Sequence, residues 1–170
     1  MPEQKTFLYF SYGSNMLTVR LRERTQSAVP VRTGQITRRR LTFNKVSTDG
    51  SGKCDIEQTD KDTDLVYGII YRISVEDKQA LEKAEGVGKG YDESTIEVAT
   101  SEGTERAITY IATSKDPSLN PYHWYKALVV CGALEHGLPA YYVDWIRTIR
   151  SKEDFDVERR AKNEAILCRG

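Results

Sequence analysis

The chain has 170 residues, of which 39% are hydrophobic and 29% are charged, a composition typical of a single soluble folded domain. Its 25 Lys and Arg residues equal its 25 Asp and Glu residues, so its net charge does not favour a nucleic-acid or membrane partner. Three widely spaced cysteines without a CxxC pair disfavour a zinc site and a disulfide framework, and the absence of a long apolar run disfavours a membrane span or signal peptide.

The first segment of the chain combines a strand, a polar turn and a helix. Residues 7–11 alternate aromatic and apolar side chains, which predicts a β-strand. A turn of small and polar residues follows at 12–15, and residues 16–23 have the apolar spacing of a helix. A strand that enters a helix through such a turn leaves backbone N–H groups free at the start of the helix. Because these groups bind carboxylates, phosphates or a developing oxyanion, we expect a site here.

The remaining elements are mostly strands with helices between them. Strands are predicted at 29–36, 40–44, 54–57, 65–73, 95–100 and 106–112, the last two as a hairpin. Helices are predicted at 75–84 with Ser74 as N-cap, from 121 to about 137, at 139–150, and from about 154 onward. This order predicts an α+β fold, a small closed mixed β-barrel flanked by α-helices. We expect one domain over 1–170, with 151–170 at its periphery.

Glu85 is the second feature that suggests a site. It ends a predicted helix and is followed by three glycines within five residues. The C-terminus of a helix disfavours a negative charge, so a carboxylate there has a raised pKa and suits a general base. Taken alone, the residues favour the plainer interpretation that Gly86 caps the helix and Glu85 lies at the surface.

Taken together, several segments occur in the order of one known family. They are Phe7–Leu17, Glu85-Gly86-Val87 followed by Tyr91, Tyr125-Lys126, Cys131-Gly132-Ala133 and Gly137-Leu138-Pro139. In these residues the chain resembles the γ-glutamylcyclotransferase family with its AIG2-like fold, over roughly 6–150. It is more similar to the animal-type branch than to the γ-glutamylamine branch.

The resemblance implies a specific reaction and site. It implies a small mixed barrel that releases 5-oxoproline and an amino acid from a γ-glutamyl amino acid, without a metal or an organic cofactor. Glu85 matches the essential glutamate, which acts as general acid and base. The residues implied in substrate binding are Tyr12, Gly13, Ser14, Asn15, Met16, Leu17, Tyr91 and Tyr125. The resemblance further suggests a small-molecule γ-glutamyl partner, a homodimer and a cytoplasmic location.

Other functions remain open at this stage. One is removal of a γ-glutamyl group from a biosynthetic amine or a carrier-bound intermediate, and another is a non-catalytic binding protein on the same fold. Ser14 lies in no GxSxG motif, and neither histidine has a recognisable paired acid, which disfavours a serine hydrolase. The apolar neighbours of Cys131 favour a buried structural thiol. Tyr12 and Tyr125 are alternatively packing residues.

Overall fold

The computed structural model of the chain describes residues 2–169. Its elements in chain order are β1 (Thr6–Ser11), the 3-10 helix η1 (Ser14–Met16), α1 (Thr18–Arg24), β2 (Val29–Thr37), β3 (Arg39–Val46), β4 (Gly52–Gln58), β5 (Leu65–Ser74), the 3-10 helix η2 (Val75–Asp77), α2 (Lys78–Glu85), β6 (Tyr91–Thr100), β7 (Gly103–Ala112), α3 (His123–Glu135), α4 (Ala140–Arg147) and α5 (Val157–Arg169). Each predicted strand and helix is present, with shifts of a few residues at the ends.

Five strands close into a barrel in the order β1-β5-β2-β6-β7. The pairs are antiparallel except β1 with β7, where Tyr9 lies opposite Ile108 in a parallel bridge. The nearly continuous apolar run of β5 fits its position, because this strand pairs with both β1 and β2. The predicted mixed barrel with flanking helices is therefore confirmed.

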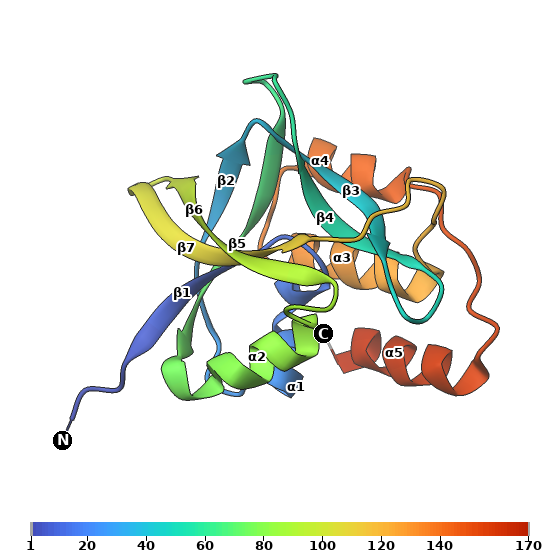
Figure 1. Cartoon of the computed structure of the whole chain (residues 1–170), viewed down its shortest axis with the longest axis horizontal. Coiled ribbons are helices and arrows are strands. Elements are labelled where there is room, and N and C mark those ends of the chain that lie inside the picture. The colour runs from blue at the N-terminus through green and yellow to red at the C-terminus, as the bar shows by residue number, and fades with distance from the viewer. Residues whose placement is uncertain (1, 170) are drawn as a thin grey trace.

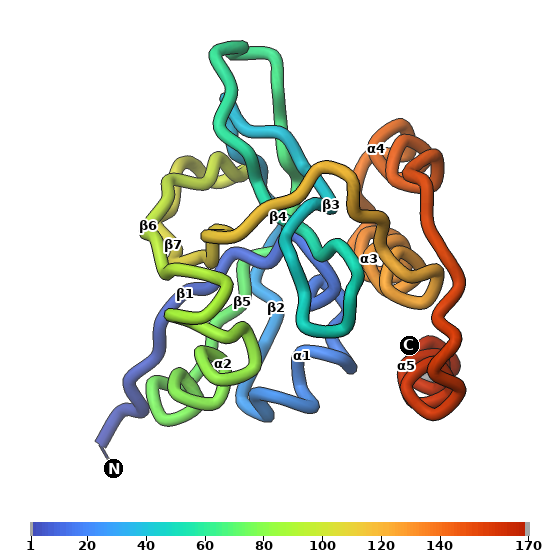
Figure 2. Tube along the Cα trace, turned by 45° about the vertical axis from the view of Figure 1, so that its right-hand side comes forward, coloured from blue at the N-terminus to red at the C-terminus, as the bar shows by residue number. Residues whose placement is uncertain are grey.

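β3 and β4 form a separate two-stranded antiparallel sheet. In Figures 1 and 2 this sheet lies between the barrel and α3, while α1 and α2 lie together beneath the barrel. Residues from the end of the barrel, from α1 and α2 and from the small sheet line one cavity.

The ends of three elements differ from the sequence prediction for identifiable reasons. The predicted helix at 75–84 begins as a 3-10 turn, in which the Ser74 side chain accepts a hydrogen bond from the Glu76 amide, and becomes α-helical only at Lys78. α4 ends at Arg147, before the predicted end at residue 150, and the Thr148 hydroxyl that follows it donates to the Trp145 carbonyl at 2.6 Å. β6 begins at Tyr91, four residues before the prediction, because its polar first residues still pair with the end of β7.

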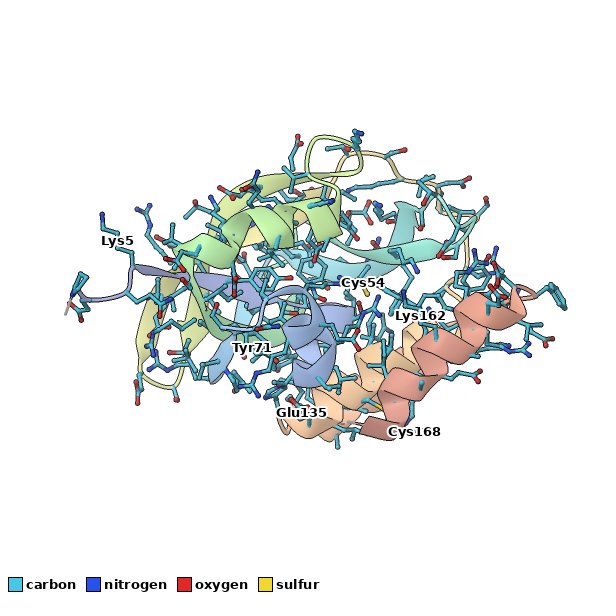
Figure 3. The ribbon with its side chains drawn as sticks, turned by 90° about the horizontal axis from the view of Figure 1, so that it is seen from below. Lys5, Cys54, Tyr71, Glu135, Lys162 and Cys168 are labelled. Carbon is cyan, nitrogen blue, oxygen red and sulfur yellow. The ribbon has the colours of Figure 1, made fainter. Side chains whose placement is uncertain are left out.

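The last helix is tied to the rest of the fold more closely than expected. Figure 3 shows α5, which carries Lys162 and Cys168, running beside α1 and α3. Trp124 Nε1 donates to Asp154 Oδ2 at 2.9 Å just before α5, and Ile166 on the helix is buried. Arg20 Nη1 donates to Asn163 Oδ1 at 3.1 Å. Through Asn163, α5 therefore supports α1.

Gly132 on α3 lets the first loop pack directly against that helix. A Cβ at this position would lie 2.6 Å from the Leu17 amide nitrogen and 2.7 Å from Met16 Cβ. We expect Gly132→Ala to destabilise the protein by about 1–3 kcal/mol through overpacking, a fall in Tm of about 2–10 °C. Thermal unfolding measures this. The exposed Leu134→Ala on the same helix is the control, and an unchanged Tm for Gly132→Ala would contradict the packing described.

Candidate active site

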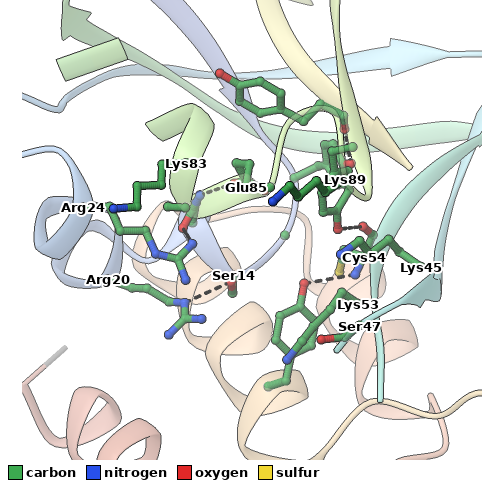
Figure 4. Close-up of a pocket in the computed structure, with 18 of the residues that line it drawn as sticks. Ser14, Arg20, Arg24, Lys45, Ser47, Lys53, Cys54, Lys83, Glu85 and Lys89 are labelled. Atoms are coloured by element: carbon green, nitrogen blue, oxygen red, sulfur yellow. Dashed lines mark hydrogen bonds between the residues drawn. The ribbon is translucent and has the colours of Figure 1, made fainter. Parts of the chain in front are cut away.

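A cavity of about 340 Å³ opens between the barrel, α1, α2 and the β3–β4 sheet. Its lining combines tyrosines, cations and one carboxylate (Figure 4). The lining residues are Tyr9, Tyr12, Gly13, Ser14, Asn15, Arg20, Arg24, Lys45, Ser47, Thr48, Lys53, Cys54, Lys83, Ala84, Glu85, Gly86, Lys89, Tyr91, Tyr110 and Tyr125. Two segments that are far apart in sequence, the first loop and the end of α2, therefore line the same space.

The loop after β1 reaches the cavity through its backbone and its small side chains. The 3-10 helix begins at Ser14, so the amides of its first residues have no carbonyl acceptor within the helix. Within residues 2–169 the amides of Ser14 and Asn15 have no hydrogen-bond partner, whereas the next two amides turn back onto Gly13 and Ser14 carbonyls. The loop thus offers unused N–H donors beside the cavity.

Glu85 is the carboxylate of this cavity. It ends α2 as expected, and Gly86 caps the helix in the left-handed region at φ 68°. Asn15 Nδ2 donates to Glu85 Oε1 at 2.6 Å, and the Tyr9 hydroxyl donates to the same oxygen at 3.4 Å. The Glu85 side chain therefore points into the cavity and contacts the first loop, rather than lying at the surface.

Burial raises the pKa of Glu85 above its ordinary value. The positive charge of Arg24, the hydrogen bond from Tyr9 and the charges of Arg20 and Lys45 act in the opposite direction and limit the rise. A carboxylate with a raised pKa accepts and returns a proton more readily near neutral pH than an exposed one does. The geometry and the pKa together suit Glu85 to proton transfer.

Arg24 is connected to Glu85 through the amide of Asn15. Arg24 Nη1 donates to Asn15 Oδ1 at 3.1 Å, while the other end of the same amide binds Glu85. Arg24 thus fixes which end of Asn15 faces the carboxylate, and its charge also favours the ionised form of Glu85.

We expect Arg24→Gln to move the acid limb of the pH profile of kcat/KM to higher pH. Removing the cation raises the pKa of Glu85 further, so the base becomes protonated at a higher pH and activity is lost earlier as the pH falls. On the acid side we expect kcat/KM roughly threefold below wild type, the scale of one partly screened charge. Arg22→Gln on the same helix is the matched control, and an acid limb that moves down or stays fixed in Arg24→Gln would contradict this.

Tyr91 and Tyr125 bracket the backbone of Cys54 at the side of the cavity. The Tyr91 hydroxyl donates to the Cys54 carbonyl at 2.6 Å, and the Cys54 amide donates to Tyr125 Oη at 3.0 Å. Both tyrosines are almost completely buried. Their rings therefore line the cavity while their hydroxyls hold β4 in place.

The structure brings most of the predicted site residues together. Tyr12, Gly13, Ser14, Asn15, Glu85, Tyr91 and Tyr125 all line the cavity. Met16 and Leu17 do not, because their side chains are fully buried and pack towards α3. The Tyr12 hydroxyl donates a hydrogen bond to the Tyr110 carbonyl, so the Tyr12 ring forms part of the cavity wall.

Comparisons with known proteins agree on one family. The model of the AIG2-like family matches residues 65–146. Mouse γ-glutamylcyclotransferase is 34% identical over 158 residues, which cover 89% of this chain and 82% of the mouse protein. The human protein of the same name is 31% identical, over 89% of this chain and 83% of its own length. The chain belongs to the γ-glutamylcyclotransferase family.

A solved structure supports this membership. A γ-glutamyl cyclotransferase structure has a TM-score of 0.84 and 29% sequence identity, over 98% of this chain and 100% of that one. The resemblance read from the first loop, Glu85 and the Gly-Leu-Pro turn is thereby confirmed, and so is the prediction of an enzyme.

In this family member, the sequence prediction did not include most of the charged residues that line the cavity. The lining residues outside the predicted site, charged and uncharged, are Tyr9, Arg20, Arg24, Lys45, Ser47, Thr48, Lys53, Cys54, Lys83, Ala84, Gly86, Lys89 and Tyr110. The position of Arg20 and Arg24 could have been predicted, because residues four apart on the helix after the loop share one face. The position of the lysines of β3 and β4 could not, since tertiary packing determines where that sheet lies.

The serine and cysteine side chains of the family member do not support covalent catalysis by a nucleophile of the enzyme. Ser14 Oγ accepts a hydrogen bond from Arg20 Nε at 3.0 Å, so a cation rather than a base contacts it. Burial raises the pKa of the Cys54 thiol to about 12, which keeps it protonated at neutral pH. Cys131 is half-buried and Cys168 exposed, and neither lines the cavity.

The two histidines also lie outside the cavity. His123 is exposed. His136 has an acidic partner that was not recognised from the sequence. Its Nε2 lies 2.6 Å from Glu135 Oε2. The same nitrogen lies 2.9 Å from the Met16 carbonyl, so His136 supports the first loop from behind. Figure 3 shows the neighbouring Tyr71 and Glu135 in this region.

Within residues 2–169, no group of three or more His, Cys, Asp or Glu side chains has a metal-binding arrangement. No helix formed by these residues is both long enough and apolar enough to cross a membrane.

Proposed function

We propose that this enzyme cyclises γ-glutamyl amino acids, releasing 5-oxoproline and a free amino acid. The observation that carries the proposal is the contact of Glu85, a half-buried carboxylate of raised pKa, with the loop that offers unused amides. The family membership supports the same reaction, since the mouse and human relatives are named γ-glutamylcyclotransferase. The proposed reaction is an intramolecular acyl transfer with a place in the metabolism of glutathione-related compounds.

In this mechanism the α-amine of the substrate is the nucleophile. It is an ammonium at neutral pH, so Glu85 first removes one proton. The free amine then attacks the γ-carbonyl carbon, which forms the C–N bond of the five-membered ring. Of the three ammonium hydrogens, one stays on the ring nitrogen and two move to the leaving nitrogen. Glu85 carries these two in turn, and the original amide bond breaks as the amino acid leaves.

The first loop has two roles in the proposed mechanism. Attack on the γ-carbonyl produces an oxyanion, and the amides of Ser14 and Asn15 are suited to stabilise it, at typically about 3 kcal/mol per donor. The glutamyl α-carboxylate needs donors of its own, which the start of η1 together with Arg20 is suited to supply. Holding both ends of the glutamyl chain brings its amine to its carbonyl.

The charges of the cavity favour an amino acid over a simple amine as leaving group. A γ-glutamyl amino acid carries a second carboxylate, on the leaving residue, and a γ-glutamyl amine does not. Lys53 lies beside Tyr125 on the β4 side of the cavity, and burial lowers the pKa of its ammonium to about 8. Such cations favour a carboxylate ligand. A γ-glutamyl amine offers no such carboxylate to Lys53, whose Nζ otherwise pairs with Asp49 Oδ2 at 3.1 Å. An amine substrate, a carrier-bound intermediate and a non-catalytic binding protein are the alternatives that the test below separates.

Product analysis of a substrate panel tests the proposal. The purified protein is incubated with γ-glutamyl-alanine, glutathione and a γ-glutamyl alkylamine, and 5-oxoproline is measured by mass spectrometry. We expect 5-oxoproline from γ-glutamyl-alanine and much less from the amine. No product from any compound would favour the binding protein, and preferential turnover of the amine would favour the biosynthetic alternative. The homodimer and the cytoplasmic location remain predictions.

A further inference from the structure

The cavity carries more positive charge than the proposed reaction requires. It is lined by Arg20, Arg24, Lys45, Lys53, Lys83 and Lys89, against a single carboxylate, Glu85. Lys53 has a partner, since its Nζ lies 3.1 Å from Asp49 Oδ2. Within residues 2–169, Lys45, Lys83 and Lys89 form no ion pair within 4.0 Å. Three lysines of the lining are therefore without a carboxylate.

A γ-glutamyl derivative of a neutral amino acid does not balance this charge. It carries two carboxylates and one ammonium, and the ammonium faces Glu85 in the proposed mechanism. In the proposed mechanism the loop amides and Arg20 bind the glutamyl carboxylate, and Lys53, which shares its charge with Asp49, binds the carboxylate of the leaving residue. The remaining lysines are left for a third anionic group.

Lys45 and Lys89 lie together on one side of Glu85. Figure 4 shows both on the side of Cys54 and Lys53, across from Arg20, Arg24 and Lys83. Lys45 Nζ lies 4.7 Å from the centre of the Tyr91 ring, and its alkyl chain and ammonium approach Gly90, next to Lys89. The Lys45 amine therefore belongs to the wall that Tyr91 forms, and Lys89 lines the same cavity two residues before Tyr91 in the chain.

Lys45 has the character of an unfilled anion site. Its side chain is half-buried, and this burial lowers the pKa of its ammonium, with Glu85 and Asp49 opposing from a distance. Its contact with the Tyr91 ring replaces only part of the hydration that the ammonium has lost, and no carboxylate replaces the rest. An anion bound between Lys45 and the exposed Lys89 would restore that interaction.

We propose that the preferred substrates are γ-glutamyl derivatives of acidic amino acids, whose side-chain carboxylate binds Lys45 and Lys89. The proposal rests on the proposed cyclisation and specifies its substrate class. The cations of α1 and α2 remain for the glutamyl half, and the cations of β3 and the α2–β6 loop bind the leaving half.

The experiment compares γ-glutamyl-glutamate with γ-glutamyl-glutamine, which differ only in the charge of the leaving side chain. We expect wild-type kcat/KM to be about tenfold higher for the glutamate compound at low salt, the scale of two partly exposed charge pairs. The difference should lie in KM and fall in 0.5 M NaCl. In the double variant Lys45→Gln, Lys89→Gln we expect a ratio below about twofold. Lys61→Gln, an exposed lysine of the β4–β5 loop, should keep the wild-type ratio.

Two outcomes separate this inference from the proposed function. Equal kcat/KM for both compounds, with 5-oxoproline formed from each, would overturn the acidic-substrate proposal and leave the cyclisation intact. No product from either compound would overturn the cyclisation and the kinetic form of the inference. Calorimetry of both compounds on Glu85→Gln measures the charge preference without turnover, and equal dissociation constants there would overturn the anion site itself.

Discussion

Replacing Glu85 by glutamine is expected to lower kcat by about 10²–10⁴-fold, the usual contribution of a positioned general acid and base. Glutamine keeps the shape of the side chain and its hydrogen-bonding position near Asn15, but it cannot accept the proton of the substrate ammonium. The measurement is the rate of 5-oxoproline release from γ-glutamyl-alanine under saturating substrate. Glu82→Gln, one turn earlier on α2, is the matched control and should keep wild-type kcat.

The fold of the Glu85→Gln variant is expected to be intact. Because the pKa of Glu85 is higher in the folded state than in the unfolded chain, its ionised form destabilises the fold at a pH above the folded-state pKa. This destabilisation is lost as the pH falls from the folded-state pKa to the ordinary pKa of a glutamate. The neutral glutamine removes it at neutral pH. We therefore expect a Tm at pH 7 equal to or above that of wild type. A well-folded variant with near-wild-type kcat would contradict the proton-transfer role.

Replacing Gly13 by valine is expected to abolish productive substrate binding. A Cβ at this position would already lie 3.1 Å from Cys54 Cβ and 3.4 Å from Tyr125 Oη, and the two further methyl groups must displace β4 or enter the cavity. We expect KM to rise by at least about tenfold, which corresponds to about 1.4 kcal/mol of lost binding. Steady-state kinetics with γ-glutamyl-alanine measures the change.

A graded pair of variants separates steric exclusion from loss of fold. Gly13→Ala adds only the Cβ, which a shift of a few tenths of an ångström accommodates, so we expect a KM between wild type and Gly13→Val. Titration of a non-cleavable γ-glutamyl analogue by calorimetry provides the binding readout. An unchanged dissociation constant in Gly13→Val would contradict a binding role for this loop.

The sequence predicts the architecture well because the strong local signals agree with the packing. The apolar β5 is central, Ser74 caps the turn before α2, and Glu102-Gly103 turns the hairpin of β6 and β7. The separate β3–β4 sheet was not predicted, since pairing partners depend on tertiary contacts that no short segment encodes. The helix α5 was predicted but its position was not, because side-chain contacts of Asp154 and Asn163 fix it.

The site is predictable where one segment contains both the chemistry and the geometry. The loop at 12–15 and Glu85 each combine a chain reversal with polar groups, and both line the cavity. Met16 and Leu17 belong to the same sequence motif, but the turn of the 3-10 helix directs them to the core. Lys45 and Lys53 reach the cavity from the β3–β4 sheet, so their proximity to Glu85 appears only in three dimensions.

The central claim is that the substrate's own amine, with Glu85 as proton carrier, closes the ring. The most direct test is the mass spectrum of products from γ-glutamyl-alanine incubated with the enzyme in ¹⁸O-labelled water. Cyclisation involves no water, so the account predicts 5-oxoproline without ¹⁸O, and loss of this product in Glu85→Gln. Glutamate carrying one ¹⁸O atom would show hydrolysis instead and would contradict the account.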